Sequence, residues 1–454
     1  MKKILCINPP AGKVIGKLSR DGRCQSEEGT WTETFPPTTL ASIAGHIRSK
    51  NHIVKLIDCI GSNISWHNLK SQIKDFSPDV VIINTVTPTI KEDLNVARIT
   101  KQISNSIITS AYGTMPSAMP QELKKWCPEL DFSIRGDPET PALNIVEGRP
   151  LSRDIWIEED LDSLGLPAYE LLPTYQFPLN GKRWTFLIDG KGCPYRCIYC
   201  VEPVISKRKA RYKSIPRVIE EIDCIVNKYH FPFFMFWDEL FTLNIERSKE
   251  ICEKIIKLGL NKKCQWMITT RVDKADKELF TLMKQAGCWM VVFGIESGNQ
   301  KVLDSVKKDI TLEQSRMAVN TAYLCGLKTV GHFIMGLPGS NVDADKDTID
   351  FALSLPLNFA QFYCCTAFPG SELYDIAVKN GYLSVDSWDY IEQGTANIGY
   401  PHYNAQSIQH LRRAAYNKFY WRYIFFIRFL NCLSINGLIQ LIPRGLRFIR
   451  WMKK

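Results

Sequence analysis

The residues with the clearest chemistry in this sequence are three cysteines that fall within eight positions. Cys193, Cys197 and Cys200 have the spacing C-x3-C-x2-C, and the strand-like stretch 184–190 precedes them. A structural zinc site needs four protein ligands and normally shows a second Cys or Cys/His pair nearby, whereas three thiolates can hold an iron–sulfur cluster with one iron left open. The next thiol, Cys224, stands alone in a helical pattern. The spacing therefore favours a cluster-binding loop over a zinc knuckle or a chance grouping.

This loop resembles the cluster loop of the radical S-adenosylmethionine enzymes, including the aromatic Tyr199 directly before the last cysteine. The resemblance implies that the three cysteines are the metal ligands of a [4Fe-4S] cluster. In that family the open iron takes the amino and carboxylate groups of S-adenosylmethionine, and an electron from the cluster cleaves the sulfonium to give a 5′-deoxyadenosyl radical. The resemblance also implies a partner that supplies the electron, a reductant such as flavodoxin or ferredoxin.

Length and composition predict a globular protein of two or three domains. The chain has 454 residues, and 45% of them are hydrophobic, which is ample for cores of that size. Fifteen cysteines could indicate disulfides, but Met1-Lys2-Lys3 runs straight into a strand pattern without a secretory signal. We therefore predict a cytoplasmic protein whose thiols stay reduced.

Residues 1–150 alternate strand and helix patterns five times. The strands are expected at Ile4–Ile7, Ile53–Ile57, Val80–Ile83, Ile107–Ala111 and Phe132–Ile134. The helices are expected near Thr38–Arg48, Trp66–Phe76, Ile90–Gln102, Ala118–Trp126 and Thr140–Val146. Such alternation is typical of an open parallel, Rossmann-like α/β sheet with helices on both faces. Ligands of these sheets lie beyond the carboxyl ends of the strands, so we expect a cofactor face there.

The loops at those strand ends are polar, small or glycine-bearing, and a sheet domain of this kind ahead of a radical S-adenosylmethionine domain resembles the cobalamin-binding subfamily. The resemblance implies that residues 1–150 bind cobalamin. The candidate contacts are Asn8, Thr85, Gly113 and Glu139. The Asp-x-His-x-x-Gly motif, which places a histidine under cobalt in other cobalamin proteins, is missing from this part of the sequence. Any cobalamin would then bind without that lower ligand.

Residues 151–182 carry three prolines with little periodicity and are interpreted as a linker. Six strand–helix units follow in residues 183–400. Their strands are expected near Thr185–Asp189, Phe233–Trp237, Gln265–Thr269, Trp289–Phe293, Thr329–Met335 and Gln361–Thr366. Six units rather than eight favour the open, partial (β/α)6 barrel of the radical S-adenosylmethionine family, with the active site at the carboxyl ends of the strands.

By this resemblance, the strand ends supply the S-adenosylmethionine contacts. Asp238 or Glu239 would meet the amino group, although a helix N-cap is an alternative for this pair. Arg271 would pair with the carboxylate through its planar guanidinium, although a salt bridge with Asp273 or another structural acid is an alternative. The other predicted contacts are with the ribose and the adenine ring of S-adenosylmethionine.

Glu296 closes the fourth strand within Gly-Ile-Glu-Ser-Gly, and by resemblance it bonds the ribose hydroxyls, since a carboxylate can accept from two adjacent O–H donors. The other expected cofactor-binding residues are Ser297, Gly336, Phe368 and Pro369, beside Tyr199 of the cluster loop. The glycines and apolar residues of this set would allow close approach to the adenine ring.

Taken together, the motifs predict a cobalamin-dependent radical enzyme that methylates an unactivated carbon. The family resemblance implies that one S-adenosylmethionine would methylate cobalamin, and that a second would yield the radical that removes a substrate hydrogen. Two alternatives stay open: a non-methylating cyclase or rearrangement enzyme on the same scaffold, and an iron–sulfur electron-transfer or regulatory protein. The sequence does not name the substrate, and no pattern reports on the carbon attacked.

Residues 401–454 form a basic, aromatic and helical segment. Residues 409–454 hold ten Lys and Arg and no acid, which accounts for the whole net charge of +10. This pattern suits a helix in the headgroup layer of an anionic membrane, and so favours a lipid-like substrate; the alternative is a terminal helix packed on the barrel. The basic run 206–213 invites a nucleic-acid interpretation, which we disfavour because no RNA-binding domain is appended.

Overall fold

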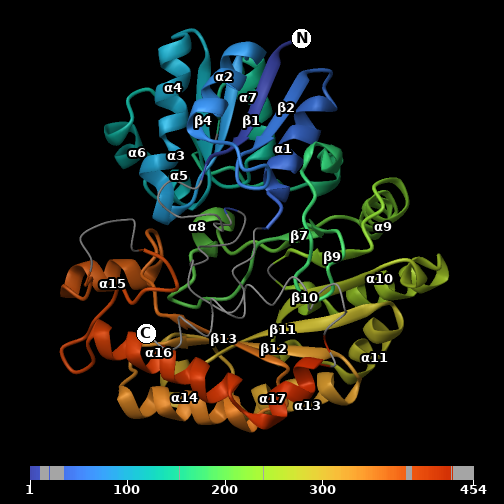
Figure 1. Ribbon diagram of the computed structural model, residues 1–454, viewed down its shortest axis with the longest axis vertical. Coiled ribbons are helices and arrows are strands. Elements are labelled where there is room, and N and C mark those ends of the chain that lie inside the picture. Colours follow the sequence, from blue (N-terminus) through green and yellow to red (C-terminus); the bar gives the residue numbers. More distant parts are fainter. Residues whose placement is uncertain are drawn as a thin grey trace.

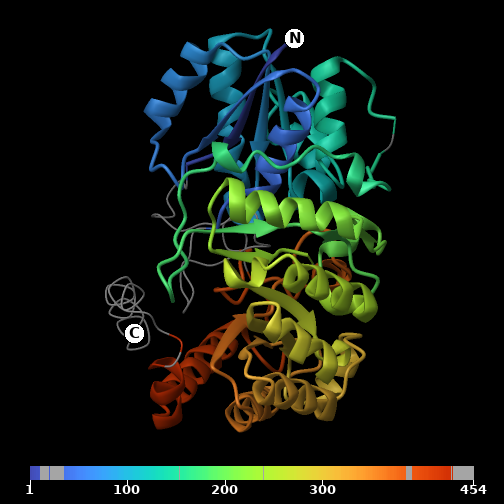
Figure 2. The ribbon, with the colours of Figure 1, turned by 90° about the vertical axis from the view of Figure 1, so that its right-hand side faces the viewer.

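The computed structural model describes residues 1–10, 20, 35–152, 154–238, 240–384, 391–430 and 432. Two parallel sheets, each flanked by helices, lie one above the other along the long axis of the molecule (Figure 1). Figure 2 shows the C-terminal helices at the end opposite the N-terminal sheet. The predicted α/β class is therefore confirmed, with one parallel sheet in each half.

The first sheet has the strand order β2-β1-β3-β4-β5, and all its pairings are parallel. Its strands are β1 (Lys3–Asn8), β2 (Ile53–Asp58), β3 (Val80–Asn84), β4 (Ile108–Tyr112) and β5 (Phe132–Ile134). The chain leaves β1 toward one side for β2 and returns to the other side for β3, which makes the β1/β3 boundary a topological switch point. Ligand crevices in open parallel sheets form at this place, at the carboxyl ends of the strands.

The helices of this half are α1 (Thr38–Arg48), α2 (Trp66–Phe76), α3 (Ile90–Asp93), α4 (Asn95–Ile103), α5 (Thr114–Ala118), α6 (Pro120–Trp126) and α7 (Glu139–Glu147). Two expected helices are each divided in two. The second division falls at Met119, whose φ of −135° and ψ of 56° are not helical. The next residue is Pro120, which lacks an N–H and disfavours the helical conformation of its predecessor.

The second sheet has the order β13-β12-β11-β10-β9-β6 and is also parallel throughout. Its strands are β6 (Trp184–Leu187), β9 (Phe233–Phe236), β10 (Gln265–Arg271), β11 (Cys288–Glu296), β12 (Lys328–Met335) and β13 (Phe359–Cys364). The two ends of this order do not pair with one another in the described sheet, so the barrel is open as predicted. A separate antiparallel ribbon joins β7 (Gly190–Lys191) and β8 (Arg211–Tyr212).

The helices of this half are α8 (Glu202–Ser206), α9 (Ile215–Asp223), the π-helix η4 (Cys224–Lys228), α10 (Ile245–Lys257), α11 (Lys277–Gln285), α12 (Gln300–Ser305), α13 (Leu312–Leu324), α14 (Val342–Ser354), α15 (Glu372–Asn380), α16 (Ala405–Tyr420) and α17 (Tyr423–Leu430). Short polar residues begin several of them, and Thr311 and Gln314 form a reciprocal capping box at α13. In the described part of the chain, no helix is long and apolar enough to cross a membrane.

Helix α16 covers the outer edge of β13 with side-chain hydrogen bonds. Tyr420 Oη donates to Ala360 O at 2.7 Å and accepts from Ala360 N at 3.2 Å. Tyr416 Oη accepts from Phe362 N at 3.2 Å, and Arg412 Nε donates to Phe362 O at 2.7 Å. An edge strand otherwise presents unused N–H and C=O groups. This part of the basic tail is therefore packed on the barrel, whereas residues 433–454 lie outside the described residues.

Candidate cofactor and active site

The three cysteines lie on a loop whose base is closed by the β7–β8 ribbon. All three are partly buried, and Cys200 N donates to Cys197 O at 3.1 Å, so the backbone turns tightly between the last two thiols. Gly192 opens the loop with a φ of +90°, and a Cβ there would lie 2.1 Å from Lys209 O. Only glycine satisfies both conditions, because other residues rarely adopt this backbone and would collide with the returning strand.

Arg271, at the end of β10, holds the middle of the cysteine loop. Its guanidinium lies 3.6 Å from the centre of the Tyr195 ring and 3.9 Å from Cys197 Sγ, and its Nε donates to Asp273 Oδ1 at 2.8 Å. Its Nη2 also donates to Lys308 O at 2.7 Å. Of the two alternatives from the sequence, the structure shows the Asp273 salt bridge. The carboxylate role of Arg271 stays a prediction, with most of its donors already engaged.

Glu296 lies at a register shift where β11 meets β12. Its φ is +69°, which is uncommon outside glycine, and its side chain accepts from Lys308 Nζ at 2.7 Å. Burial raises the pKa of Tyr199 well above its usual value, and the charge of the nearby Glu296 is the second largest cause. Burial lowers the pKa of His332, beside them on β12, to about 4, against the smaller effect of Glu296. Glu296 therefore lies within electrostatic reach of both Tyr199, which was predicted, and His332, which was not.

Other predicted S-adenosylmethionine contacts have local structural partners. Ser297 Oγ lies 3.1 Å from Thr348 Oγ1 and accepts from Asn299 N, and Gly336 N donates to Asp345 Oδ2 at 2.8 Å. Phe368 packs in a small apolar cluster with Val86 of the first half, and Pro369 follows it. These contacts do not assign a ligand, so the cofactor roles stay predictions.

The acidic pair after β9 is only partly described. Asp238 is buried, and its charge, after burial, is a cause of the raised pKa of Tyr212 on β8. It therefore lies near Tyr212 at the base of the cysteine loop, and its role toward the S-adenosylmethionine amino group stays a prediction. Glu239 lies outside the described residues.

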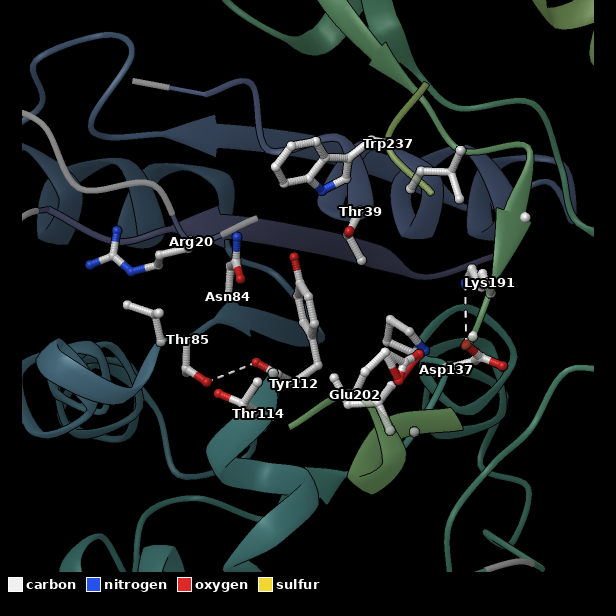
Figure 3. A pocket seen from close by; sticks show the side chains of 18 residues that line it. Arg20, Thr39, Asn84, Thr85, Tyr112, Thr114, Asp137, Lys191, Glu202 and Trp237 are labelled. Atoms are coloured by element: carbon white, nitrogen blue, oxygen red, sulfur yellow. Dashed lines mark hydrogen bonds and ion pairs between the residues drawn. The ribbon is translucent and has the colours of Figure 1, made fainter. Parts of the chain in front are cut away.

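A cavity lies between the carboxyl ends of the first sheet and the start of the barrel (Figure 3). The loops after β3, β4 and β5 line it with Thr85, Tyr112, Gly113 and Asp137 among others, and Lys191 and Trp237 close it from the barrel side. Thr85 and Gly113 thus line the cavity, and their cobalamin-binding roles stay predictions. Among the described residues that line this cavity there is no histidine, which fits cobalamin bound without a histidine ligand.

Asn8 and Glu139 are not among the described residues that line this cavity, and their cobalamin-binding roles stay predictions. Asn8 Nδ2 donates to Asp58 Oδ1 at 2.7 Å, and Asn8 Oδ1 accepts from Arg20 at 3.2 Å. Arg20 in turn forms a fully buried salt bridge with Asp93 at 2.6 Å. Arg20 itself lines the cavity and was not predicted from the sequence, because a lone arginine carries no motif.

Comparisons with known proteins bear on both halves. Residues 187–352 match the family described as radical SAM superfamily, and residues 30–146 match the B12 binding domain. The chain is 30% identical over 440 residues to an uncharacterized methyltransferase, PH0819, of Pyrococcus horikoshii, covering 92% of this chain and 93% of the relative. The chain belongs to the cobalamin-binding radical S-adenosylmethionine family. Its cofactors are therefore a [4Fe-4S] cluster, S-adenosylmethionine and cobalamin, as the motifs predicted.

Other members of the cobalamin-binding radical S-adenosylmethionine family share the fold. The radical S-adenosylmethionine methyltransferase TsrM from Kitasatospora setae superposes with a TM-score of 0.66 at 15% identity, covering 86% of this chain and 82% of that one. The anaerobic magnesium-protoporphyrin IX monomethyl ester cyclase of Rubrivivax gelatinosus is 27% identical, covering 76% of this chain and 66% of its own length. The family thus contains proteins named for different reactions.

The side chains fit the family's cofactors. In the described ranges no three His, Cys, Asp or Glu side chains converge as ligands of a single metal ion would. The thiolates of an iron–sulfur cluster bind different irons, so a cluster loop does not need such convergence. The loop presents three partly buried thiols beside the Arg271 cation, and the sheet edge presents an open cavity without a histidine among its described walls.

Proposed function

We propose that this protein transfers a methyl group from S-adenosylmethionine, by way of cobalamin, to an unactivated carbon of a small-molecule substrate. The observation that carries the proposal is the shared wall of the two sites. Lys191 and Gly192 line the sheet-edge cavity, and Cys193 of the cluster loop follows directly. A methyl donor in the cavity would therefore lie beside the place where the substrate radical forms.

When bound, the cofactors supply the radical and the methyl group, and the chain's own residues position them. The thiolates of Cys193, Cys197 and Cys200 would hold three irons, and the Glu296 carboxylate would accept hydrogen bonds from the ribose. The ring of Trp237, which lines the cavity from the barrel side, would exclude water from the space between the two sites.

A second candidate is a radical cyclase that does not transfer a methyl group. It is favoured by the sequence likeness to the Rubrivivax gelatinosus cyclase over 376 residues. The present geometry serves either reaction, because each could use a radical formed at the cluster loop. The fate of the methyl group separates them.

The deciding experiment follows that methyl group. The protein is reconstituted anaerobically with iron, sulfide and hydroxocobalamin and given methyl-deuterated S-adenosylmethionine, a chemical reductant and a metabolite extract. We expect labelled methylcobalamin first and a labelled product later, both detected by mass spectrometry. The same reaction with the Cys193→Ala variant is the control for radical-dependent product. Formation of 5′-deoxyadenosine without any labelled methylcobalamin would refute the methyltransferase proposal and leave the cyclase.

We propose further that a small iron–sulfur or flavin protein supplies the electron.

We also propose that the basic tail contacts an anionic membrane surface. The membrane proposal is supported by exposed apolar and aromatic side chains on the C-terminal helices and on α13. Trp421, Tyr423 and Leu324 are 55%, 80% and 81% exposed. Flotation with anionic and neutral vesicles tests it: binding to anionic vesicles should be lost at high salt and on removal of residues 433–454. Equal recovery in the unbound fraction for the full-length and shortened proteins would refute it.

A further inference from the structure

Four buried charges join the base of the cysteine loop to the first sheet. Lys191 and Arg211 face each other across the β7–β8 ribbon, and the residues between them include all three cysteines. Both cations reach the loop that follows β5, where Asp137 and Glu139 stand two positions apart. We call these four side chains the charge clamp.

The contacts within the charge clamp are short and well shielded. Lys191 Nζ lies 2.8 and 2.7 Å from the two oxygens of Glu139 and 3.6 Å from Asp137 Oδ1. Arg211 Nη1 bonds Asp137 Oδ2. Only 14% of the Lys191 side chain is exposed, against 1% of Glu139 and 4% of each member of the other pair. Removing a charge from water costs free energy, which a buried ion pair offsets only when its two partners are held in a close and well-aligned geometry. The clamp therefore fixes the ribbon in one position on the sheet.

The charge clamp lines one cofactor site and adjoins the other along the chain. Asp137 and Lys191 line the sheet-edge cavity, where Figure 3 shows them joined at one end of it. Lys191 is separated from Cys193 by Gly192 alone. A group that fills the cavity therefore contacts the same side chains that set the position of the cluster loop.

We propose that the charge clamp couples the two cofactor sites, so that cobalamin in the cavity strengthens binding of S-adenosylmethionine at the cluster loop. A filled cavity holds Asp137 and Lys191 in the arrangement that anchors the ribbon, and the anchored ribbon presents the cysteine loop in its binding position. The coupling is reciprocal, because linked equilibria change each other's affinity by the same factor. The proposal rests on the cofactors of the family and does not require methyl transfer.

The test measures binding rather than turnover. The full-length protein with its reconstituted cluster is titrated with S-adenosylmethionine, without reductant so that no cleavage occurs, in the presence and in the absence of hydroxocobalamin. The measured quantity is the ratio of the two dissociation constants. For the unmodified protein we expect cobalamin to lower the dissociation constant at least about five-fold, the lower end of ordinary allosteric coupling.

Three variants separate coupling from general stability. Lys191→Gln leaves the buried Glu139 carboxylate without its cation, so the double variant Glu139→Gln/Lys191→Gln is included as a neutral, hydrogen-bonding replacement. The control is Lys209→Gln, which breaks the Lys209–Glu159 pair on the same loop, where both side chains are 53% exposed. We expect the ratio to fall to about one in both clamp variants and to stay unchanged in the control.

Hydrogen exchange gives a second readout. Cobalamin should slow exchange of the amides in residues 190–213 of the unmodified protein and not in the double variant. A ratio of one in the unmodified protein would refute the proposal. So would a clamp variant that loses thermal stability but keeps its ratio, since that result describes a structural support only. Loss of the ratio in the Lys209 control would also count against the clamp. Because no substrate is present, these outcomes do not depend on the methyltransferase proposal.

Discussion

The carboxyl ends of the two sheets use their charged side chains in different ways. Charges are paired at both: Arg20 with Asp93 and Glu139 with Lys191 at the first sheet, and Arg271 with Asp273 and Lys308 with Glu296 at the second. At the second sheet one of these paired cations, Arg271, also lies 3.9 Å from Cys197 Sγ of the cysteine loop. We therefore expect binding at the first site to depend on shape and many small contacts, and binding at the second to depend on a few groups beside the cluster loop. Single substitutions should therefore weaken cofactor binding more at the barrel than at the sheet-edge cavity.

The largest effect is expected at the cluster ligands. Changing Cys193, Cys197 or Cys200 to Ala should abolish the site-differentiated cluster and all formation of 5′-deoxyadenosine, because three thiolates are the minimum that leaves one iron open. Iron analysis, electron paramagnetic resonance and product assay measure this. Cys224→Ala, in the π-helix η4, is the matched control and should keep iron and activity. Loss of iron in the Cys224 variant would show that the ligand assignment is wrong.

The next effect is expected at Glu296. Its replacement by Ala should weaken S-adenosylmethionine binding by about 1.5–3 kcal/mol, the usual value of hydrogen bonds to a charged group. Glu296→Gln, which keeps an oxygen to accept from Lys308, should lose less. Equilibrium binding to the reconstituted protein measures both, and iron content should stay intact. An unchanged affinity in the Ala variant would remove the ribose role.

A pH effect should appear at His332 on the barrel side. Burial lowers its pKa to about 4, while Glu296 opposes and Lys308 adds to this shift. A histidine that is neutral when folded stabilises the protein above the unfolded pKa of about 6.5, and the stability is lost as the pH falls from there toward 4. The loss should reach about 2 kcal/mol by pH 5, measured by urea unfolding, and should be smaller in His332→Gln. The same pH dependence in both proteins would show that His332 is not responsible.

The elements that position both sites could be predicted from the sequence, but most of the contacts between them could not. Strands such as β3 are continuous apolar runs, and helix α1 has the predicted bounds. By contrast, Glu139 finds Lys191 across 52 positions and Tyr420 finds the backbone of Ala360 across 60. Nothing local marks such pairs, because they depend on how the two sheets are placed. The motif residues could be given expected positions because the resemblance supplied that placement, and their roles stay predictions.

The smallest effect on cofactor binding should come from a substitution at the first sheet. It tests most directly whether binding there depends on many small contacts. Thr85 lines the cavity, but its hydroxyl already donates to Tyr112 O at 2.8 Å. Thr85→Ala should therefore weaken cobalamin retention by only about 0.5–1.5 kcal/mol, the net value of one neutral hydrogen bond. Gel filtration after loading with hydroxocobalamin measures retention, and a base-off absorption spectrum is expected in both proteins. Gly113→Ala is the contrasting variant, because its Cβ would lie 2.5 Å from Thr85 O and should displace the cavity wall. A Thr85 effect as large as that of Glu296→Ala would show that the first site, too, depends on a few groups.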